Sequence, residues 1–179
     1  MSTFDNLHNH FERVARAVAG VNLYEVEKAC LILSQVRKLD AAVWLIGNGG
    51  SAATCAHFAN DLEKMCGVRA IPVPELTAMV TAHGNDEGWE NMFSKVIQRN
   101  AGVHDVVVAL SCSGNSPNVV RVADDHAYNE LIVFTGNDPD CKLARIRPSA
   151  LIMVPDDDIK VQEDVHLAIC HAMAGVLSK

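Results

Sequence analysis

The chain has 179 residues, of which 49% are hydrophobic and 21% charged, with 11 Gly and 6 Pro. This composition predicts one compact globular domain and excludes a disordered chain, a collagen-like fibre and a multidomain machine. The net charge is −7 and the longest run of like charge is Asp156 to Asp158, so the electrostatic footprint of a nucleic-acid-binding protein is missing.

Two features bear on the compartment. The longest apolar runs are about six residues, far below the roughly 20 that cross a bilayer, and Asp5 stands where a signal peptide would carry Lys or Arg. We therefore expect a cytoplasmic protein. The six cysteines form no Cys-x-x-Cys pair and are expected to be reduced thiols that act as small hydrophobic residues.

The first 40 residues predict two helices. Apolar residues recur with helical spacing between residues 4 and 18, after Thr3 as a plausible N-cap and before Gly20 as a stop. A second helix is predicted from about residue 24 to 39, and it is apolar on more than one face. Because no sheet precedes these helices, we expect residues 1–40 to pack against other copies of the chain in an oligomer.

From residue 41 onward the pattern changes to short, continuous apolar runs at 42–46, 70–73, 106–110, 131–134 and 150–154, separated by helical segments. Runs without polar alternation are typical of parallel strands buried on both faces. The fold class is therefore predicted to be α/β, a doubly wound, mainly parallel five-stranded sheet flanked by helices. Residues 41–179 would form this core, 1–179 a single domain, and a last helix would begin near Asp158.

Two turns stand out, because ligands of doubly wound sheets bind beyond the carboxyl ends of the strands. The first run is followed by Gly47-Asn48-Gly49-Gly50-Ser51, and the third by Ser111-Cys112-Ser113-Gly114-Asn115-Ser116. Glycines, free helix-start amides and serine hydroxyls together suit a phosphate group. One such turn is equally well an ordinary strand-to-helix connection, but two favour a phosphorylated ligand. Neither matches a dinucleotide or nucleoside triphosphate motif, so a small phosphate ester is expected.

His57 and Asp61 are four residues apart on the helix that follows the first of these turns. This spacing places an imidazole and a carboxylate on one helical face, which is typical of metal ligands or of an acid–base pair. A local hydrogen-bonded pair is the alternative.

On the last helix, Glu163 and His171 lie about 12 Å apart along the axis, so a site that uses both could be completed by a neighbouring chain. Asp164, seven residues before His171, lies on nearly the same helical face as His171, whereas Glu163 does not. The choice between the two acids as the second site residue of this helix stays open. His166 is expected elsewhere on the surface of that helix.

Four segments resemble the sugar isomerase (SIS) domain family, in its phosphoheptose isomerase branch: GNGGSAATCAHFAND at 47–61, GND at 84–86, SCSGNSPN at 111–118 and EDVHLAICH at 163–171. The resemblance covers essentially the whole chain. It implies a homotetramer built around a helical bundle, active sites at subunit interfaces, and interconversion of sedoheptulose 7-phosphate with D-glycero-D-manno-heptose 7-phosphate through an enediol.

The resemblance also implies roles for individual residues. The catalytic pair would be Asp61 as base and His171 as its acid–base partner. One Zn²⁺ ion per site would be held by His57, Asp61, Glu163 and His171. Substrate contacts would come from the two turns, from the helix start and from one distant acid: Asn48, Gly49, Gly50, Ser51, Asp86, Ser111, Cys112, Ser113, Ser116 and Glu163.

The chain departs from the family pattern at four of these positions or their neighbours. Cys112 replaces the usual Thr and is a poorer donor; Asp61 is one methylene shorter than the usual Glu. Glu163 replaces a Gln and adds a negative charge, and Lys160 stands where an Asp is common. The exact phosphosugar is therefore left open. A non-catalytic SIS module, which senses sugar phosphates or associates with the bacterial replication initiator, is the main alternative, and a purely structural oligomer is a weaker one.

Overall fold

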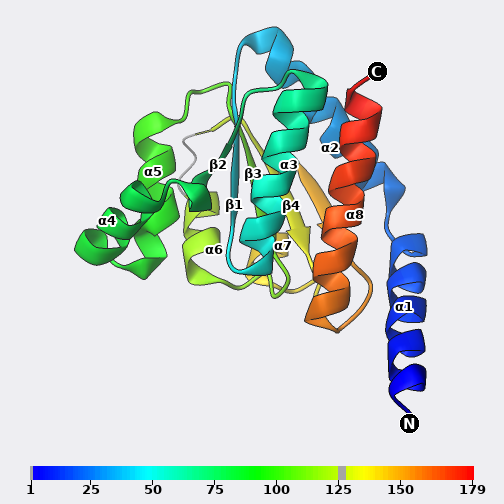
Figure 1. Cartoon of the computed structure of the whole chain (residues 1–179). Helices are drawn as coiled ribbons and strands as arrows, with labels where there is room; N and C mark the ends of the chain where they lie inside the picture. Colours follow the sequence, from blue (N-terminus) through cyan, green and yellow to red (C-terminus); the bar gives the residue numbers. More distant parts are fainter. Residues whose placement is uncertain (1, 125–127) are drawn as a thin grey trace.

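A computed structural model describes residues 2–124 and 128–179. It has three layers, with a five-stranded sheet in the middle and helices on both faces (Figure 1). The strand order is β2-β1-β3-β4-β5, and every pairing is parallel. The predicted doubly wound α/β sheet is confirmed. Its strands are β1 (Val43–Gly47), β2 (Ala70–Pro72), β3 (Val106–Ser111), β4 (Glu130–Thr135) and β5 (Ala150–Met153).

The helices divide between the two faces of the sheet. α2, α3 and α8 cover one face, α5 and α6 cover the other, and α1 runs beside α8 (Figure 1). Their bounds are α1 (Thr3–Ala19), α2 (Leu23–Val36), α3 (Gly50–Cys66), α4 (Thr77–Glu87), α5 (Met92–Asn100), α6 (Pro117–Asp124), α7 (Lys142–Arg145) and α8 (Ile159–Leu177). Short 3₁₀ turns follow at Arg37–Leu39, Val73–Glu75 and Trp89–Asn91.

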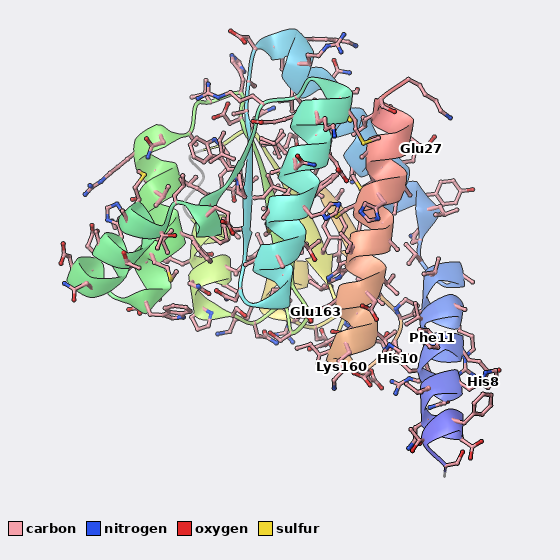
Figure 2. All side chains as sticks on the ribbon, viewed as in Figure 1. His8, His10, Phe11, Glu27, Lys160 and Glu163 are labelled. Carbon is pink, nitrogen blue, oxygen red and sulfur yellow. The ribbon has the colours of Figure 1, made fainter. Side chains whose placement is uncertain are left out.

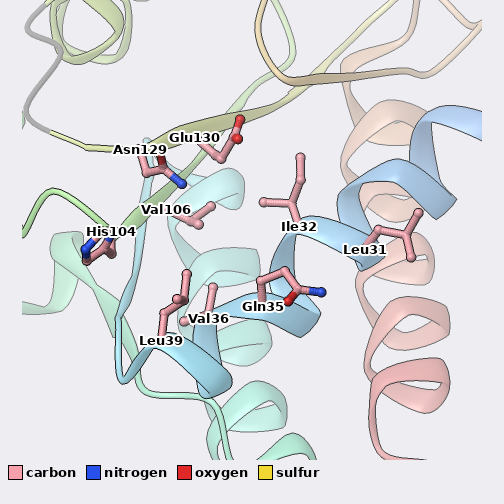
Figure 3. A pocket seen from close by; sticks show the side chains of 9 residues that line it. All are labelled: Leu31, Ile32, Gln35, Val36, Leu39, His104, Val106, Asn129 and Glu130. Carbon is pink, nitrogen blue, oxygen red and sulfur yellow. The ribbon is translucent and has the colours of Figure 1, made fainter.

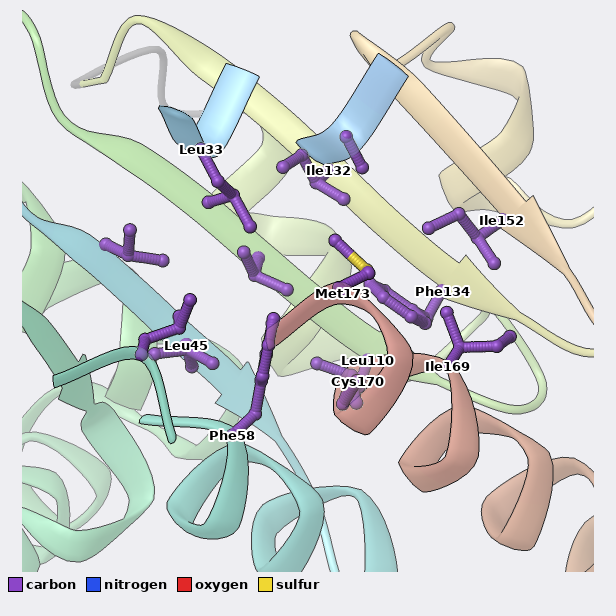
Figure 4. Packing of buried hydrophobic residues seen from close by; sticks show 14 of the residues in the cluster. Leu33, Leu45, Phe58, Leu110, Ile132, Phe134, Ile152, Ile169, Cys170 and Met173 are labelled. Atoms are coloured by element: carbon purple, nitrogen blue, oxygen red, sulfur yellow. The ribbon is translucent and has the colours of Figure 1, made fainter. Parts of the chain in front are cut away.

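The core is split by the sheet into two apolar clusters. On one side, Leu45, Leu110 and Phe134 from three neighbouring strands pack against Phe58 of α3 and Met173 of α8 (Figure 4). On the other side, the alternate strand residues pack against α5 and α6: Trp44, Ile46, Val107, Ala109, Leu131 and Val133. Because successive residues of a strand face opposite sides, burial of both faces explains why the strands are continuous apolar runs.

The strand order creates a switch point between β1 and β3. These strands are neighbours, and the chain leaves β1 toward β2 on one side while β3 continues to β4 and β5 on the other. α3, which follows β1, packs on one face of the sheet, and α6, which follows β3, packs on the opposite face. The two connections therefore diverge and leave a crevice at the carboxyl ends of β1 and β3, as in other doubly wound folds.

Two predicted helix boundaries differ from the structure. The N-cap of α1 is Ser2 rather than Thr3, because the Ser2 hydroxyl accepts from the Asp5 amide while the Asp5 carboxylate accepts from the Ser2 amide, a reciprocal capping box. The second helix, expected to reach residue 39, is α-helical only to Val36. A 3₁₀ turn covers Arg37–Leu39, and Asp40 after it has a left-handed backbone conformation.

α1 is fixed at one side of the domain and leaves much apolar surface exposed. Its Arg13 guanidinium binds the Asp156 carboxylate with two hydrogen bonds, which lowers the pKa of that carboxyl, and His10 Nε2 lies 3.2 Å from Asp164 Oδ2. Phe4 and Phe11 are 74% and 68% exposed, and the labelled α1 side chains in Figure 2 lie outside the three layers. This surface agrees with the expected packing against other copies of the chain, which stays a prediction.

His166 does not lie on the surface of α8, as the sequence suggested. Its side chain is 1% exposed, its ring meets the Phe134 ring edge-on at 5.6 Å, and its Nε2 lies 3.1 Å from the Thr135 carbonyl oxygen. α8 is buried over a wide face between α3, α1 and the sheet, and this width takes in His166. Burial lowers the pKa of His166 to about 4.

Two further observations concern the chain as a whole. Within residues 2–124 and 128–179, no helix combines the length and the apolar character needed to span a membrane. All six cysteines are free thiols; Cys30 and Cys112 are half-buried and the other four are buried.

Replacing His166 by Gln should remove the part of the fall in the free energy of unfolding between pH 6.5 and pH 4 that comes from His166. The folded-state pKa of about 4 lies below the unfolded value of 6.5, so the unfolded chain takes up the proton first. The stabilisation is complete above pH 6.5 and declines as the pH falls from 6.5 to 4, by about 3 kcal/mol at most. Denaturant unfolding at several pH values measures it. His104→Gln, at an exposed histidine, is the control and should keep the decline.

Replacing Asp105 by Ala should destabilise the sheet. This buried carboxylate accepts hydrogen bonds from the Ala42 amide at 2.9 Å, the Trp44 indole at 2.7 Å and the Gly102 amide at 2.8 Å. Loss of the acceptor leaves buried donors unpaired, so we expect the free energy of unfolding to fall by about 3 kcal/mol. Chemical denaturation monitored by tryptophan fluorescence measures the change. Asp140→Ala, at an exposed ion pair, should change stability by less than about 0.5 kcal/mol.

Candidate active site

The first serine-bearing turn ends at an uncapped helix start. Gly49, the N-cap of α3, has φ 54° and ψ −122°, a conformation that essentially only glycine adopts. No side chain caps α3, whereas Ser2, Asn22 and Asp158 cap α1, α2 and α8. The first amides of α3 are therefore free to bind an anion.

The second turn, after β3, presents several hydroxyl groups over a tight bend. Ser111 Oγ and Ser116 Oγ lie 3.2 Å apart, and Ser113 Oγ accepts a hydrogen bond from the Asn115 amide at 3.2 Å. Gly114 has φ 61°, and a side chain there would collide with Sγ of Cys141. The bend therefore requires glycine, and it holds the serine hydroxyls at fixed positions.

The two turns meet in one cavity of about 150 Å³. This volume is below the roughly 300–1,000 Å³ of a typical ligand pocket, so one chain encloses a small group rather than a whole ligand. The cavity, which we call the phosphate pocket, is lined by Asn48, Ser51, Leu110, Ser111, Cys112, Ser113, Ser116, Ile159 and Glu163. Seven of the ten expected substrate-contact residues line it, while Gly49 and Gly50 lie in the turn that forms its wall.

Glu163 rather than Asp164 reaches this pocket. Asp164 is exposed and pairs with His10 of α1, whereas Glu163 lies at the lower end of α8 beside the start of α3 (Figure 2). A Cβ on Gly50 would lie 2.5 Å from the Glu163 carboxylate, so Gly50 leaves room for that group. The phase argument favoured Asp164 because Asp164 lies on nearly the same face of the helix as His171. Glu163 does not need that phase, because it reaches the phosphate pocket rather than the His–Asp group.

Cys112 is a neutral thiol in the wall of the phosphate pocket. Burial raises its pKa to about 11, the Glu163 charge adds to the rise, and a hydrogen bond with Ser51 opposes it. The thiol therefore faces the pocket as a weak donor rather than as a charged group.

A second group of functional side chains lies higher between α3 and α8. His57 Nε2 is 3.0 Å from His171 Nε2 and 3.7 Å from Asp61 Oδ2, and His171 Nε2 is 3.9 Å from the same oxygen. Ligand atoms around a tetrahedral ion with metal–nitrogen distances of 2.0–2.1 Å lie about 3.3 Å apart. The three residues can therefore hold a metal ion, and we call them the His–Asp group.

Within one chain, Glu163 lies apart from the His–Asp group, so the expected four-residue metal set is not brought together by a single chain and stays a prediction for the oligomer. Glu163 lies two helical turns below His171 and lines the phosphate pocket instead. A 12 Å separation along a straight helix keeps the two side chains from sharing one ion within a single chain.

Asp86 is not brought to the pocket either. It is exposed near the end of α4, where its carboxylate accepts a hydrogen bond from the Asn85 side chain at 2.7 Å. Among the described residues, Asp86 is not one of those that line the phosphate pocket.

No role was predicted for Asn118, whose side chain lies behind Asn48 and outside the lining of the pocket. It is 0% exposed and pairs with the Asn48 side chain. Its position two residues after Ser116 was the available signal, but an Asn at a helix start is common without any function.

The phosphate pocket and the His–Asp group share the same two helices. Both helices start near the carboxyl edge of the sheet and run upward side by side (Figure 1). Six residues separate Ser51 from His57 and eight separate Glu163 from His171, which correspond to about 9 Å and about 12 Å of helix. A ligand anchored in the pocket could therefore extend in the direction of α3 and α8 to the His–Asp group.

A larger cavity of about 370 Å³ lies at the opposite edge of the sheet (Figure 3). It opens at the amino ends of β3 and β4, beside Val106 and Glu130, and α2 supplies a mainly aliphatic wall including Leu31 and Ile32. Its position away from the switch point and its apolar lining do not suit a phosphate ester.

Comparison with known proteins shows the family of this chain. The model of the SIS domain matches residues 7–135. The chain belongs to the SIS-domain family. It is 34% identical over 159 residues to the phosphoheptose isomerase of Helicobacter hepaticus, covering 85% of this chain and 80% of that protein.

Two solved structures of phosphoheptose isomerases have the same fold over nearly their full length. The chain superposes on a phosphoheptose isomerase from Neisseria gonorrhoeae with a TM-score of 0.88 at 29% identity, covering 98% of both chains. A phosphoheptose isomerase from Francisella tularensis gives 0.90 at 22% identity, covering 99% of this chain and 98% of that one. The resemblance inferred from the four motifs is confirmed.

Cys112 should be slow to alkylate at pH 8. Because its pKa is raised from 9.0 to about 11, its thiolate fraction should be about a hundredfold below that of an ordinary thiol. Mass spectrometry of the tryptic peptide 100–121, whose only cysteine is Cys112, measures labelling by iodoacetamide. The same peptide in urea-unfolded protein should label at an ordinary rate, and equal rates in both states would contradict the assigned environment.

Proposed function

We propose that this protein is an aldose–ketose isomerase that interconverts sedoheptulose 7-phosphate and D-glycero-D-manno-heptose 7-phosphate. One observation carries the proposal: two serine-bearing turns line a single phosphate pocket, and the His–Asp group lies farther along the same two helices. The similarity to phosphoheptose isomerases over most of the chain supports the reaction class.

The spacing between the two groups favours a long sugar chain. An extended chain advances about 1.2 Å per bond, so in a seven-carbon 7-phosphate the carbonyl carbon C2 lies about 8 Å from phosphorus and C1 about 10 Å. These lengths approach the 9–12 Å of helix between the pocket and the His–Asp group. In a five-carbon 5-phosphate, C2 would lie only about 6 Å from phosphorus, short of the group.

The phosphate would be bound by neutral donors. The hydroxyls of Ser51, Ser111 and Ser116 and the free amides of α3 hold the ester group, and Asn48 contacts a sugar hydroxyl. An anion at a helix start is favoured by the helix dipole, which replaces a charged side chain in this role.

The chemistry is a proton transfer between neighbouring carbons. Asp61 takes the proton from C1 of the ketose, forms an enediol, and returns the proton to C2, while His171 carries the hydroxyl proton from O1 to O2. The carbonyl moves from C2 to C1, and no external oxidant or reductant is needed. The side chain of Asp61 is only 12% exposed, and its other oxygen accepts a hydrogen bond from Asn60 at 3.3 Å, which fixes the carboxylate.

The His–Asp group would hold a Zn²⁺ ion through two imidazole nitrogens and one carboxylate oxygen, a donor set that suits this ion. When bound, the ion would polarise the carbonyl and hydroxyl oxygens of the sugar. The 3.0 Å between the two Nε2 atoms is the length of an N–H···N hydrogen bond, and a bound ion would replace the proton of that bond.

The assembly and the compartment complete the proposal. The exposed apolar residues of α1 and α2 support a homotetramer in which α1 and α2 pack in a helical bundle. Interfacial active sites would give Asp86 a way to reach a sugar from a neighbouring subunit. We place the enzyme in the cytoplasm, where its six free thiols would stay reduced.

Replacing His171 by Ala should reduce turnover of sedoheptulose 7-phosphate by at least a hundredfold, because the proton carrier and one metal ligand are lost together. Binding of inorganic phosphate should change by less than about twofold, since the phosphate pocket is two helical turns away. Chromatographic analysis of the products and calorimetry with phosphate measure the two quantities.

The wild-type protein should be tested first with five-, six- and seven-carbon ketose phosphates, with and without a chelator. Fastest turnover of the seven-carbon substrate, lost with the chelator and regained with Zn²⁺, is the expected result. Phosphate-ester binding without turnover of any ketose phosphate would overturn the isomerase and favour a non-catalytic SIS module. His104→Gln, at an exposed histidine far from the site, is the matched control and should keep full activity.

A further inference from the structure

The side chains of Asn48 and Asn118 form a closed pair of amides. Asn48 Nδ2 donates to Asn118 Oδ1 at 2.9 Å, and Asn118 Nδ2 donates to Asn48 Oδ1 at 2.9 Å. Asn48 directly follows β1, and Asn118 is the second residue of α6. The pair therefore joins the two turns of the phosphate pocket across the switch point of the sheet.

The two amides are not equivalent. Asn118 is 0% exposed, and both of its N–H groups have acceptors, because the second one lies 3.6 Å from Met92 Sδ on α5. Asn48 is half-buried and lines the phosphate pocket. After pairing, Asn48 keeps one N–H donor and one oxygen lone pair that no described side chain or backbone group uses.

The sulfur of Met92 decides which way round the pair lies. A closed pair of amides could turn over as a unit, since exchange of oxygen and nitrogen on both sides preserves the two hydrogen bonds between them. The thioether sulfur accepts a hydrogen bond but cannot donate one. The sulfur therefore holds the NH₂ group of Asn118 on the side of Met92. Through the two hydrogen bonds of the pair, Asn118 then determines on which side the Asn48 oxygen lies and on which side its NH₂ group lies.

We propose that Asn118 is a positioning residue that sets the orientation of the Asn48 amide, so that its free N–H donates to one sugar hydroxyl beside the phosphate and its free oxygen lone pair accepts from another. The inference rests on the proposed function, in which Asn48 contacts the sugar. Asn118 itself touches no substrate, because it is buried beneath Asn48 and does not line the pocket.

The geometry makes a specific demand on the ligand. The free N–H and the free lone pair lie on opposite edges of the Asn48 amide, so two hydroxyl groups of one sugar, the first accepting and the second donating, satisfy both, whereas inorganic phosphate near neutral pH chiefly accepts. The Asn118–Asn48 pair should therefore favour a polyhydroxy phosphate ester over phosphate alone. If Asn118 only tied the two turns together, its loss would weaken the binding of both ligands equally.

The test is a double-mutant cycle of Asn48→Ala, Asn118→Ala and the double variant, each measured against the wild type. Two quantities are followed: kcat/KM for sedoheptulose 7-phosphate, and the calorimetric dissociation constants of inorganic phosphate and of heptitol 7-phosphate. The heptitol ester, the reduced form of the sugar, cannot isomerise, so its affinity reports on binding even if the wild type shows no turnover. Failure of the proposed function is thus seen separately from failure of the cycle.

Each single variant should lose about tenfold in kcat/KM and in heptitol phosphate affinity, and the double variant should lose no more than Asn48→Ala alone. The affinity for inorganic phosphate should stay within about twofold. Losses that multiply in the double variant, or an equal loss of phosphate affinity, would overturn the inference.

Three further variants guard against misfolding and test the orientation. Asn118→Asp keeps the shape and one acceptor but cannot donate to Asn48 or to Met92, so it should lose activity as Asn118→Ala does. Met92→Leu removes only the orienting sulfur and should give a smaller loss in heptitol phosphate affinity; no loss at all would refute the role given to Met92. Asn100→Ala, which breaks an amide-to-backbone hydrogen bond on the same helix α5, should leave both affinities unchanged.

Discussion

The site depends on one constraint, the side-by-side placement of β1 and β3 with their following helices on opposite faces of the sheet. Because the strands are parallel and in register, their carboxyl ends reach the same edge, and the two serine-bearing turns open toward one another. Every other part of the site follows from this arrangement. α3 brings its uncapped amino end to the pocket, and α8 lies along α3 with Glu163 at the pocket and His171 two turns above.

The phosphate pocket has no positively charged side chain in its described lining, although its proposed ligand group is an anion. Its lining contains hydroxyls, a thiol, an amide and one carboxylate, and no lysine or arginine. An anion would therefore be held by oriented dipoles rather than by a cation, and the Glu163 carboxylate would oppose it at short range. A neighbouring subunit or a bound cation could offset this charge, which fits a site completed only in the oligomer.

The phosphate pocket and the His–Asp group differ in the kind of side chain that they present. At the pocket, Cys112 stays a neutral thiol because burial and Glu163 raise its pKa. In the His–Asp group, two imidazoles and a carboxylate lie within 4 Å of one another and remain partly open to solvent. Both ends of the site lie on α3 and α8, so the separation of the two groups along these helices sets the length of a ligand that could reach both.

The sequence determined the fold class, the two serine-bearing turns and the pairing of His57 with Asp61, because each of these depends on local order along the chain: strand runs, glycine turns and a four-residue helical step. Tertiary structure alone decided the rest. Glu163 rather than Asp164 faces the pocket because α1 occupies the other side of α8, and His166 is buried because α8 packs over a wide face. The Asn48–Asn118 pair joins residues 70 positions apart, and such a contact exists only once β1 and β3 are neighbours in the sheet.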